Sequence, residues 1–226
     1  MLNGKNTLLN FLFIACIVSL SACLAGVEVK GTTKAPPGME KLLIMPFKNM
    51  SELYGENRNV RCPISGKVLM IGKVEKGVEH GLTEQLIYLF ENRQDFQLIP
   101  TGQAIGVISE LLFNNKSKLS ERGILIETGR ALNADAVIYG YIYRYKERVG
   151  TSYSIDSPAS VAFDIHLISM TDGSLVWSGY FNETQKSLSE NLLDLGTFLK
   201  RKGRWISAHE MAMSGLEEII KTFPKP

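Results

Sequence analysis

Residues 134–145 read ADAVIYGYIYRY, and this stretch decides the fold. β-Branched and aromatic residues dominate it, and both favour extended strands. Successive side chains of a strand point to opposite faces, so every second residue lies on one face. The pattern predicts a long strand with one tyrosine-rich face. The members of this face are Val137, Tyr139, Tyr141, Tyr143 and Tyr145.

Two further strands follow this one. Residues 160–169 also alternate, with apolar side chains on one face and Asp164 and His166 on the other. Asp172-Gly173 is a type I′ turn signal, which predicts a hairpin. Residues 175–181 alternate again and form the returning strand. The three strands predict an antiparallel meander.

Helices and short strands surround this meander. Short apolar runs predict buried strands, and apolar residues at helical spacing predict amphipathic helices. The segment 49–77 has no clear periodicity and is interpreted as a long loop with one short strand. The predicted fold class is α/β. Residues 41–226 are expected to form a single domain, in which helices pack on a mixed sheet and the antiparallel meander is the C-terminal part of that sheet. The predicted strands are 41–47 and 95–99, and the predicted helices are 78–93, 101–113, 119–133 and two that begin at the capping boxes Ser187–Glu190 and Ser207–Glu210.

The N-terminus carries an export signal. A basic residue precedes an apolar run over 8–20, which spans about 20 Å as a helix and is too short for a bilayer core of about 30 Å. Such a run ending in small residues is typical of a cleaved signal peptide. The stretch Leu20-Ser21-Ala22-Cys23 resembles the lipobox of bacterial lipoproteins. The resemblance implies a signal peptide over 1–22, cleavage between Ala22 and Cys23, and lipidation of Cys23.

The lipid anchor determines the expected location. The resemblance implies three acyl chains on Cys23, and each buried CH₂ adds about 0.8 kcal/mol to membrane binding, so dissociation is expected to be negligible. Leu24 stands where an Asp commonly signals inner-membrane retention in Gram-negative bacteria, which implies the outer membrane with the domain facing the periplasm. The segment 23–40 is expected to hold the lipidated cysteine and a flexible tether, because residues 24–40 lack apolar periodicity and span about 20–25 Å as a flexible chain.

The composition describes an ordinary globular domain. The net charge is +2, from 25 Lys and Arg and 23 Asp and Glu, which does not indicate a nucleic-acid-binding protein. Cys16 leaves with the signal peptide and Cys23 is acylated, so Cys62 is the only free thiol and no disulfide within the chain is expected. A lone cysteine of this kind is expected to be buried and without a functional role.

The sequence contains no recognised catalytic motif. There is no G-x-S-x-G, H-E-x-x-H or C-x-x-C pattern, and Ser65 stands where a second cysteine would follow Cys62. The three histidines lie on different predicted elements, whereas a zinc site needs several converging ligands. Asp164 and His166 share a strand face and are interpreted as a polar pair on a partly exposed face. The sequence therefore predicts no enzyme, no metal and no cofactor.

Two motifs carry a resemblance to known envelope proteins. The runs 135–140 (DAVIYG) and 171–178 (TDGSLVWS) resemble a domain shared by curli secretion-channel lipoproteins, penicillin-binding-protein-activator lipoproteins and the N-terminal part of the Tol-system propeller protein. The resemblance implies an α/β sandwich without known catalytic residues. Curli channels also need two long alternating hairpins, and the corresponding segment 144–160 is charged, short and interrupted by Pro158. A channel is therefore not favoured.

Two regions are candidates for binding. The tyrosine-rich face is a candidate for a ligand or a partner peptide, and the alternative is that it packs under helices with its hydroxyls at the rim. A basic stretch flanked by aromatic residues is a candidate for docking to a membrane or an acidic partner, and the alternative is solvated cations at a helix C-terminus. The members of this basic stretch are Phe198, Lys200, Arg201, Lys202, Arg204 and Trp205.

These observations predict a non-enzymatic, lipid-anchored lipoprotein on the periplasmic side of the outer membrane. It is expected to bind or scaffold other envelope components. Nucleic acid is not an expected partner. The alternative is an oligomeric component of an envelope secretion or assembly complex, for which copies of the chain would associate with one another.

Overall fold

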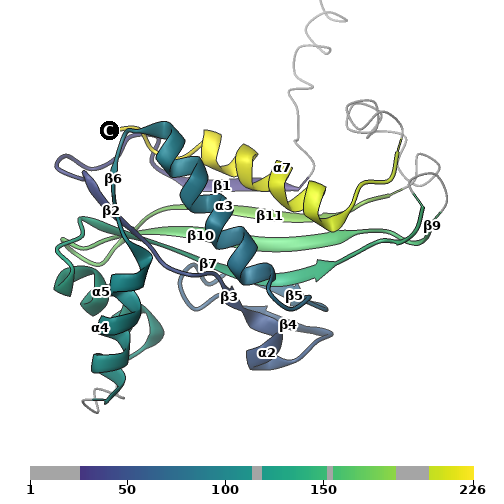
Figure 1. Ribbon diagram of the computed structural model, residues 1–226, viewed down its shortest axis with the longest axis horizontal. Helices are drawn as coiled ribbons and strands as arrows, with labels where there is room; N and C mark the ends of the chain where they lie inside the picture. Colours follow the sequence, from purple (N-terminus) through teal and green to yellow (C-terminus); the bar gives the residue numbers. More distant parts are fainter. Residues whose placement is uncertain (1–25, 114–118, 152–154, 187–203) are drawn as a thin grey trace, which may run out of the picture.

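The computed structural model describes residues 26–113, 119–151, 155–186 and 204–226 (Figure 1). The predicted signal peptide, the lipobox cysteine and the first of the two predicted C-terminal helices lie outside the described residues.

One mixed sheet organises the chain (Figure 1). Its order is β1-β11-β10-β7-β2-β6, with the short β3 also paired to β7. The strands from β1 to β7 in this order are antiparallel, whereas β2 pairs in parallel with both β7 and β6. The predicted α/β class and the antiparallel meander are confirmed. The strands are β1 (Val27–Gly31), β2 (Lys41–Ile44), β3 (Lys48–Asn49), β6 (Gln97–Ile99), β7 (Ala136–Lys146), β10 (Ser160–Ser169) and β11 (Leu175–Thr184).

Both faces of the sheet are covered. The helices α3 (Val78–Arg93) and α7 (Ala208–Lys221) lie across one face (Figure 1). The other face carries three helices and a hairpin, which are α2 (Met50–Tyr54), α4 (Thr101–Phe113), α5 (Glu121–Ala131) and β4 (Arg58–Arg61) with β5 (Val68–Ile71). A further small hairpin joins β8 (Val149–Gly150) to β9 (Ile155–Ser157). Because the sheet is covered twice, every residue of β10 is buried.

Two separate cores result from this arrangement. The α3/α7 layer includes Phe90, Phe163, Trp177, Leu216 and Phe223, which are all nearly fully buried. The hairpin layer, on the opposite face, includes Leu43, Met50, Ile71, Tyr141 and Ile168.

The helix α7 begins as its sequence predicts. The side chain of Ser207 accepts a hydrogen bond from the Glu210 N–H at 3.0 Å, and the Glu210 carboxylate accepts from the Ser207 N–H at 3.0 Å. This reciprocal capping box satisfies two amide groups that the first turn leaves unpaired. The helix packs closely on β11, because a Cβ at Gly179 would lie 2.4 Å from Ile219 Cγ2.

The expected tether is shorter than predicted. Residues 27–31 form the edge strand β1, which pairs with β11 from Val27↔Phe181 to Gly31↔Trp177. The stretch alternates Val-Glu-Val-Lys, and its two valines pack on the α3/α7 layer. Met39, near the end of the predicted tether, is also buried. The prediction of a flexible segment across 24–40 is wrong for β1, because five residues are too few to show periodicity clearly.

The segment interpreted as a long loop is also more ordered than expected. It holds the short helix α2 and the β4–β5 hairpin, whose turn is the Cys62–Gly66 stretch. The turn between β10 and β11 differs from prediction as well. A type I′ turn requires positive φ at both central residues, and here Gly173 has φ 70° while Asp172 does not.

One residue of the tyrosine-rich face lies on the other side of the sheet. The register between β7 and β10 shifts, because Ala162 pairs with Arg144 whereas Phe163 pairs with Ile142. Tyr143 is the extra residue of this bulge. A bulge inserts one residue and changes the alternation beyond it. Tyr145 therefore packs in the α3/α7 layer and not with the other tyrosines, which corrects the predicted face.

Candidate functional site

The most unusual group of side chains lies inside the hairpin layer. Asp164 and His166 are two positions apart on β10, so both face this layer, and Cys62 follows the end of β4. We call these three residues the Cys–Asp–His cluster. His166 Nε2 lies 3.5 Å from Cys62 Sγ and 3.5 Å from Asp164 Oδ2. Their exposed fractions are 1%, 0% and 0% for Cys62, Asp164 and His166, so the predicted partly exposed polar pair is in fact fully buried.

Asp164 is held by two donors from β7. Its Oδ2 accepts from the Tyr143 hydroxyl at 2.8 Å, and its Oδ1 accepts from the Tyr141 N–H at 3.2 Å. Burial raises the pKa of this carboxyl to about 7, and His166 opposes that shift only in part. Removal from water disfavours the charged form of an acid, so the cluster is an unfavourable place for an uncompensated carboxylate.

His166 has a defined orientation. Its Nδ1 lies 3.3 Å from the carbonyl oxygen of Tyr139, which can only accept a hydrogen bond, so Nδ1 carries the proton. Burial lowers the pKa of this imidazole, which favours its neutral form. The lone pair of Nε2 then points toward Cys62 and Asp164.

The turn that carries Cys62 is fixed by its own backbone. The Cys62 N–H donates to the Lys67 carbonyl at 2.8 Å, and the Gly66 N–H donates to the Cys62 carbonyl at 2.9 Å. Gly66 has φ 74°, a conformation that favours glycine. The Ser65 N–H points at Cys62 Sγ from 3.4 Å. The sulfur is therefore positioned by the hairpin and receives a backbone donor.

The tyrosines proposed as a binding face are covered by the chain itself. Tyr139, Tyr141 and Tyr143 are at most 7% exposed and lie in the hairpin layer. The Tyr139 hydroxyl donates to Glu121 Oε1 at 3.1 Å, and Lys48 Nζ contacts the same oxygen at 2.5 Å. Burial raises the pKa of all three phenols, so their hydroxyls remain protonated donors.

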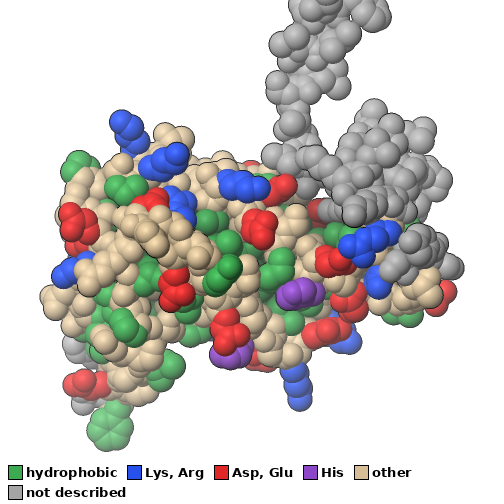
Figure 2. All heavy atoms as spheres, turned by 45° about the horizontal axis from the view of Figure 1, so that its top comes forward, with side chains coloured by type: hydrophobic (Ala, Val, Ile, Leu, Met, Phe, Trp, Pro, Cys, Tyr) green, Lys and Arg blue, Asp and Glu red, His purple; other side chains and the backbone are tan. Residues whose placement is uncertain are grey.

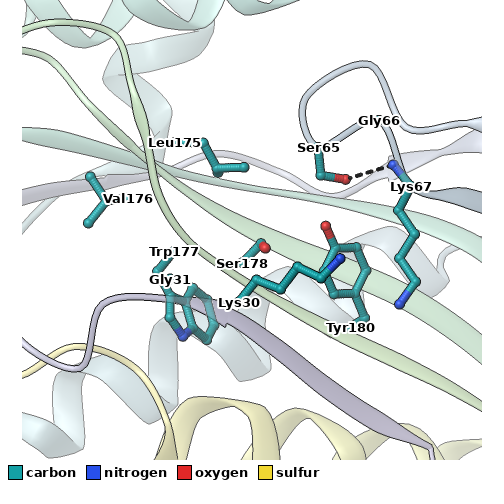
Figure 3. Close-up of a pocket in the computed structure, with 10 residues that line it drawn as sticks. All are labelled: Lys30, Gly31, Ser65, Gly66, Lys67, Leu175, Val176, Trp177, Ser178 and Tyr180. Atoms are coloured by element: carbon teal, nitrogen blue, oxygen red, sulfur yellow. Dashed lines mark hydrogen bonds between the residues drawn. The ribbon is translucent and has the colours of Figure 1, made fainter.

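An open cavity lies next to the Cys62 turn (Figure 3). Its volume is about 300 Å³, and Ser65, Gly66 and Lys67 of the turn form part of its wall. Figure 3 shows Lys30 and Lys67 reaching into it beside Tyr180. Lys67 Nζ lies 4.1 Å from the centre of the Tyr180 ring.

The cations of this cavity are already partly neutralised. Lys67 and Lys30 both contact the carboxylate of Glu28, the latter at 3.4 Å. The hydrogen bond from Lys67 is the main reason that the pKa of Glu28 is lowered. One carboxylate offsets one of the two lysine charges, so the attraction of the cavity for an anionic ligand is reduced.

The basic stretch is described only at its end. The Arg204 side chain contacts Glu210 Oε1 at 2.6 Å. The backbone carbonyl of Arg204 accepts a hydrogen bond from Gln185 Nε2 at 3.1 Å. The Trp205 carbonyl accepts from Arg148 Nη1 at 2.8 Å. These two residues are tied to the domain. The members outside the described residues are Phe198, Lys200, Arg201 and Lys202.

Helix α4 exposes several large apolar side chains, although its Ile108 packs on the hairpin layer. Only Ala104 of this helix is buried, while Ile105, Leu112 and Phe113 are 58%, 56% and 88% exposed. Elsewhere, on the face that Figure 2 shows, acidic and basic side chains are interspersed. Among the helices that the structure describes, none is long and apolar enough to cross a membrane.

Sequence reasoning found the parts of the Cys–Asp–His cluster but not their convergence. The alternation of β10 placed Asp164 and His166 together. Cys62 was assigned to an irregular loop, so its side chain had no expected direction. The sequence signal that could have indicated this convergence is the short apolar strand that follows Cys62. A hairpin at this position packs on the sheet and places its turn, which includes Cys62, over the sheet.

Comparisons with known proteins concern the fold. No family model matches the chain, and no curated protein matches it. The fold resembles the PelC dodecamer structure from Paraburkholderia phytofirmans, with 13% identity, 88% of this chain and 99% of that chain covered, and a TM-score of 0.48. It also resembles the LpoB C-terminal domain from Escherichia coli (18% identity, 69% and 87% covered, TM-score 0.40). A third resemblance is to lipoprotein GNA1162 from Neisseria meningitidis (16% identity, 71% and 91% covered, TM-score 0.38).

Proposed function

We propose that this chain is a lipid-anchored lipoprotein of the bacterial envelope. Its α/β domain binds other envelope components at the periplasmic surface of the outer membrane and catalyses no reaction. The observation that supports this proposal most is the position of β1, which begins at Val27, four positions after the lipobox residue Cys23.

The short distance to the anchor restricts what the domain can reach. Residues 24–26 extend over about 10 Å at most. The strand that follows is part of the main sheet, because β1 pairs with β11 along its length. A partner must therefore come to the membrane surface. This differs from the longer tether expected from sequence.

The absence of catalysis is supported by the burial of the reactive groups. Cys62, Asp164 and His166 would be the natural choice for nucleophile and base, but each is at most 1% exposed. A substrate has to bring its reacting atom within hydrogen-bond reach of such groups. The cavity beside them is lined by Lys67 on the side of the turn and does not open onto Cys62 Sγ.

The anchor is tested by lipid labelling of the full-length protein in a bacterial host. Cys23→Ser should abolish incorporation of labelled palmitate and release the protein from membranes. Cys16→Ser is the matched control, since this cysteine lies within the predicted signal peptide and should leave labelling unchanged. A Cys23→Ser protein that still carries label, or still sediments with membranes, contradicts the proposal.

The restricted reach is tested by lengthening the linker. Fifteen Gly and Ser residues are inserted between Ala25 and Gly26, and a photoreactive amino acid is placed at the exposed Met70, Tyr88 or Leu112 in separate proteins. With the unmodified linker, discrete crosslinks to envelope proteins are expected. The insertion should reduce the crosslinking from at least one of the three photoreactive positions. Equal crosslinking with both linkers would mean that closeness to the membrane does not select the partner.

The oligomeric alternative is supported by a different observation. Leu112 and Phe113 follow Ile105 by seven and eight positions, which is about two helical turns, so the three side chains lie on one face of α4. All three are exposed there. The occupant we consider for this face is a second copy of the chain. Native mass spectrometry of the detergent-solubilised lipoprotein should then show a closed oligomer that Phe113→Ser dissociates. A monomer at all concentrations removes this alternative and leaves the first proposal in place.

A further inference from the structure

We propose that Cys62, Asp164 and His166 bind one zinc ion or a similar divalent transition-metal ion inside the hairpin layer. This inference is independent of the proposed function, because it rests only on the geometry within the domain. The ligand atoms, which are a sulfur, a nitrogen and an oxygen, all lie within 4.8 Å of one another. They come from two parts of the chain that are about a hundred positions apart.

The separations between these atoms fit a tetrahedral ion. Zinc binds sulfur at about 2.3 Å and nitrogen or oxygen at about 2.0–2.2 Å, so tetrahedral angles place neighbouring ligand atoms about 3.4–3.6 Å apart. The observed distances from His166 Nε2 are 3.5 Å to Cys62 Sγ and 3.5 Å to Asp164 Oδ2. A charge-assisted hydrogen bond between imidazole and carboxylate would be about 2.7–2.9 Å long. The imidazole and the carboxylate are thus spaced as two ligands are and not as a hydrogen-bonded pair.

The surrounding hydrogen bonds have the pattern of a metal site. A metal-binding histidine usually donates its other ring N–H to a carbonyl or carboxylate, which fixes the tautomer. His166 does this through Nδ1 to the Tyr139 carbonyl at 3.3 Å. Asp164 is oriented by the Tyr143 hydroxyl and the Tyr141 N–H, and Cys62 Sγ receives the Ser65 N–H.

The charges of the three ligands would balance those of a divalent ion. A thiolate and a carboxylate contribute two negative charges, the imidazole is neutral, and the complex has no net charge. Buried charges are tolerated when they are paired or coordinate a metal. Three protein ligands leave the fourth position of a tetrahedron for a water molecule, and the Tyr143 hydroxyl supports the ligand Asp164 by donating to its Oδ2 at 2.8 Å.

The chemistry of the donors selects the class of metal. Calcium and magnesium take oxygen ligands, whereas a thiolate with an imidazole suits zinc and the neighbouring transition metals. The site is buried on all sides by the β4–β5 hairpin and the sheet. An ion there would fasten the turn at Cys62 to β10 and would have a structural role.

The test uses the lipoprotein purified from membranes in detergent without chelators. Its metal content is measured, the protein is unfolded with a chelator, and it is refolded with Co²⁺. We expect one Co²⁺ per chain, a thiolate-to-cobalt charge-transfer absorption in the ultraviolet and strong visible bands from tetrahedral coordination, all displaced by Zn²⁺. A refolded wild-type protein with native circular dichroism but without the charge-transfer absorption overturns the proposal.

Variants assign the site to these residues. Cys62→Ser should remove the charge-transfer absorption, and His166→Gln should abolish stoichiometric binding, whereas the control His80→Gln changes an exposed histidine and should bind as the wild type does. Tyr143→Phe keeps all three ligands and should weaken binding about ten- to a hundredfold, as loss of a supporting hydrogen bond does. Retention of the absorption by a folded Cys62→Ser protein overturns the assignment. If the ligand variants fail to fold, the wild-type spectrum and the Tyr143→Phe affinity decide.

Discussion

The two faces of β10 are buried equally but hold different chemistry. Toward α3 and α7 the strand presents Phe163, Ile165 and Leu167, which are all 0% exposed and pack among apolar side chains. Toward the β4–β5 hairpin it presents Asp164 and His166, also 0% exposed. The α3/α7 layer is therefore stabilised by removal of apolar area from water. The hairpin layer depends in addition on polar groups that must keep their partners, because an unpaired buried polar group is costly.

The largest effect is expected in the α3/α7 layer. Trp177→Ala should lower the free energy of unfolding by about 3–5 kcal/mol, since truncation of a buried aromatic leaves a cavity. The ring is 1% exposed and packs against Phe223 with centroids 5.0 Å apart. Denaturant unfolding of the variant and the wild type measures the difference.

Trp177→Phe is the matched control. Among the described residues, Trp177 Nε1 has no hydrogen-bond partner, so phenylalanine loses no polar contact. The control should cost clearly less than the alanine variant. Equal costs would mean that this layer depends on the indole N–H, and the contrast between the two faces would be weaker than we infer.

The next effect concerns the polar face of the same strand. In the presence of a chelator, Asp164→Val should lower the free energy of unfolding by about 3 kcal/mol, because the Tyr143 hydroxyl and the Tyr141 N–H lose their acceptor. Val suits a strand, so the backbone preference is not the cause. Chemical denaturation of the metal-free proteins provides the comparison.

A wider replacement on this face should cost less than the single one. The protein Tyr143→Phe, Asp164→Val removes the hydroxyl donor together with its acceptor, and replacing both partners of a buried hydrogen bond by apolar groups can be nearly neutral. This double variant should be more stable than Asp164→Val alone. If it is the less stable of the two, the polar groups are a source of metal-free stability, which would contradict the contrast drawn above.

The difference between the two faces also explains what sequence could predict. Alternation along β7, β10 and β11 is strong because each strand is ten or eleven residues long, and it determined the meander and which side chains share a face. The bulge at Tyr143 could not be foreseen, because it depends on the register with β10 and not on β7 itself. Tyr145 was misplaced for this reason.

The Cys–Asp–His cluster was outside the reach of local patterns. Cys62 and His166 are 104 positions apart and meet only because a short hairpin folds over the sheet. The two strands of that hairpin have four residues each, which is too short for a clear alternation. The edge strand β1 was missed for the same physical reason, since its five residues are stabilised by pairing with β11.

The strand β1 offers a smaller test of the same contrast. Its residues Val27 and Val29 pack on the α3/α7 layer, whereas Lys30 is exposed and lines the cavity. Val29→Ser should lower the free energy of unfolding by about 1–2 kcal/mol through lost apolar burial. Lys30→Ser should change it by less than about 0.5 kcal/mol, as exposed substitutions usually do. Thermal unfolding of the two proteins would reveal no difference if β1 frays from the sheet in solution.

The smallest effect concerns the first turn of α7, which covers the apolar face. Ser207→Ala should cost about 1 kcal/mol, because the Glu210 N–H loses its acceptor at the helix start. The hydrogen bond from the Ser207 N–H is the main reason that the pKa of Glu210 is lowered in the folded protein. A lowered folded pKa means that this carboxylate stabilises the fold above the pKa of the unfolded chain and less as pH falls through the folded pKa. The cost of Ser207→Ala should therefore be larger at neutral pH than in acid. In acid, protonation of Glu210 has already removed part of the capping box. Urea unfolding at neutral and at acidic pH measures this cost. A cost that is the same at the two pH values would mean that the serine acts alone and that the glutamate does not help to hold α7 on the apolar face.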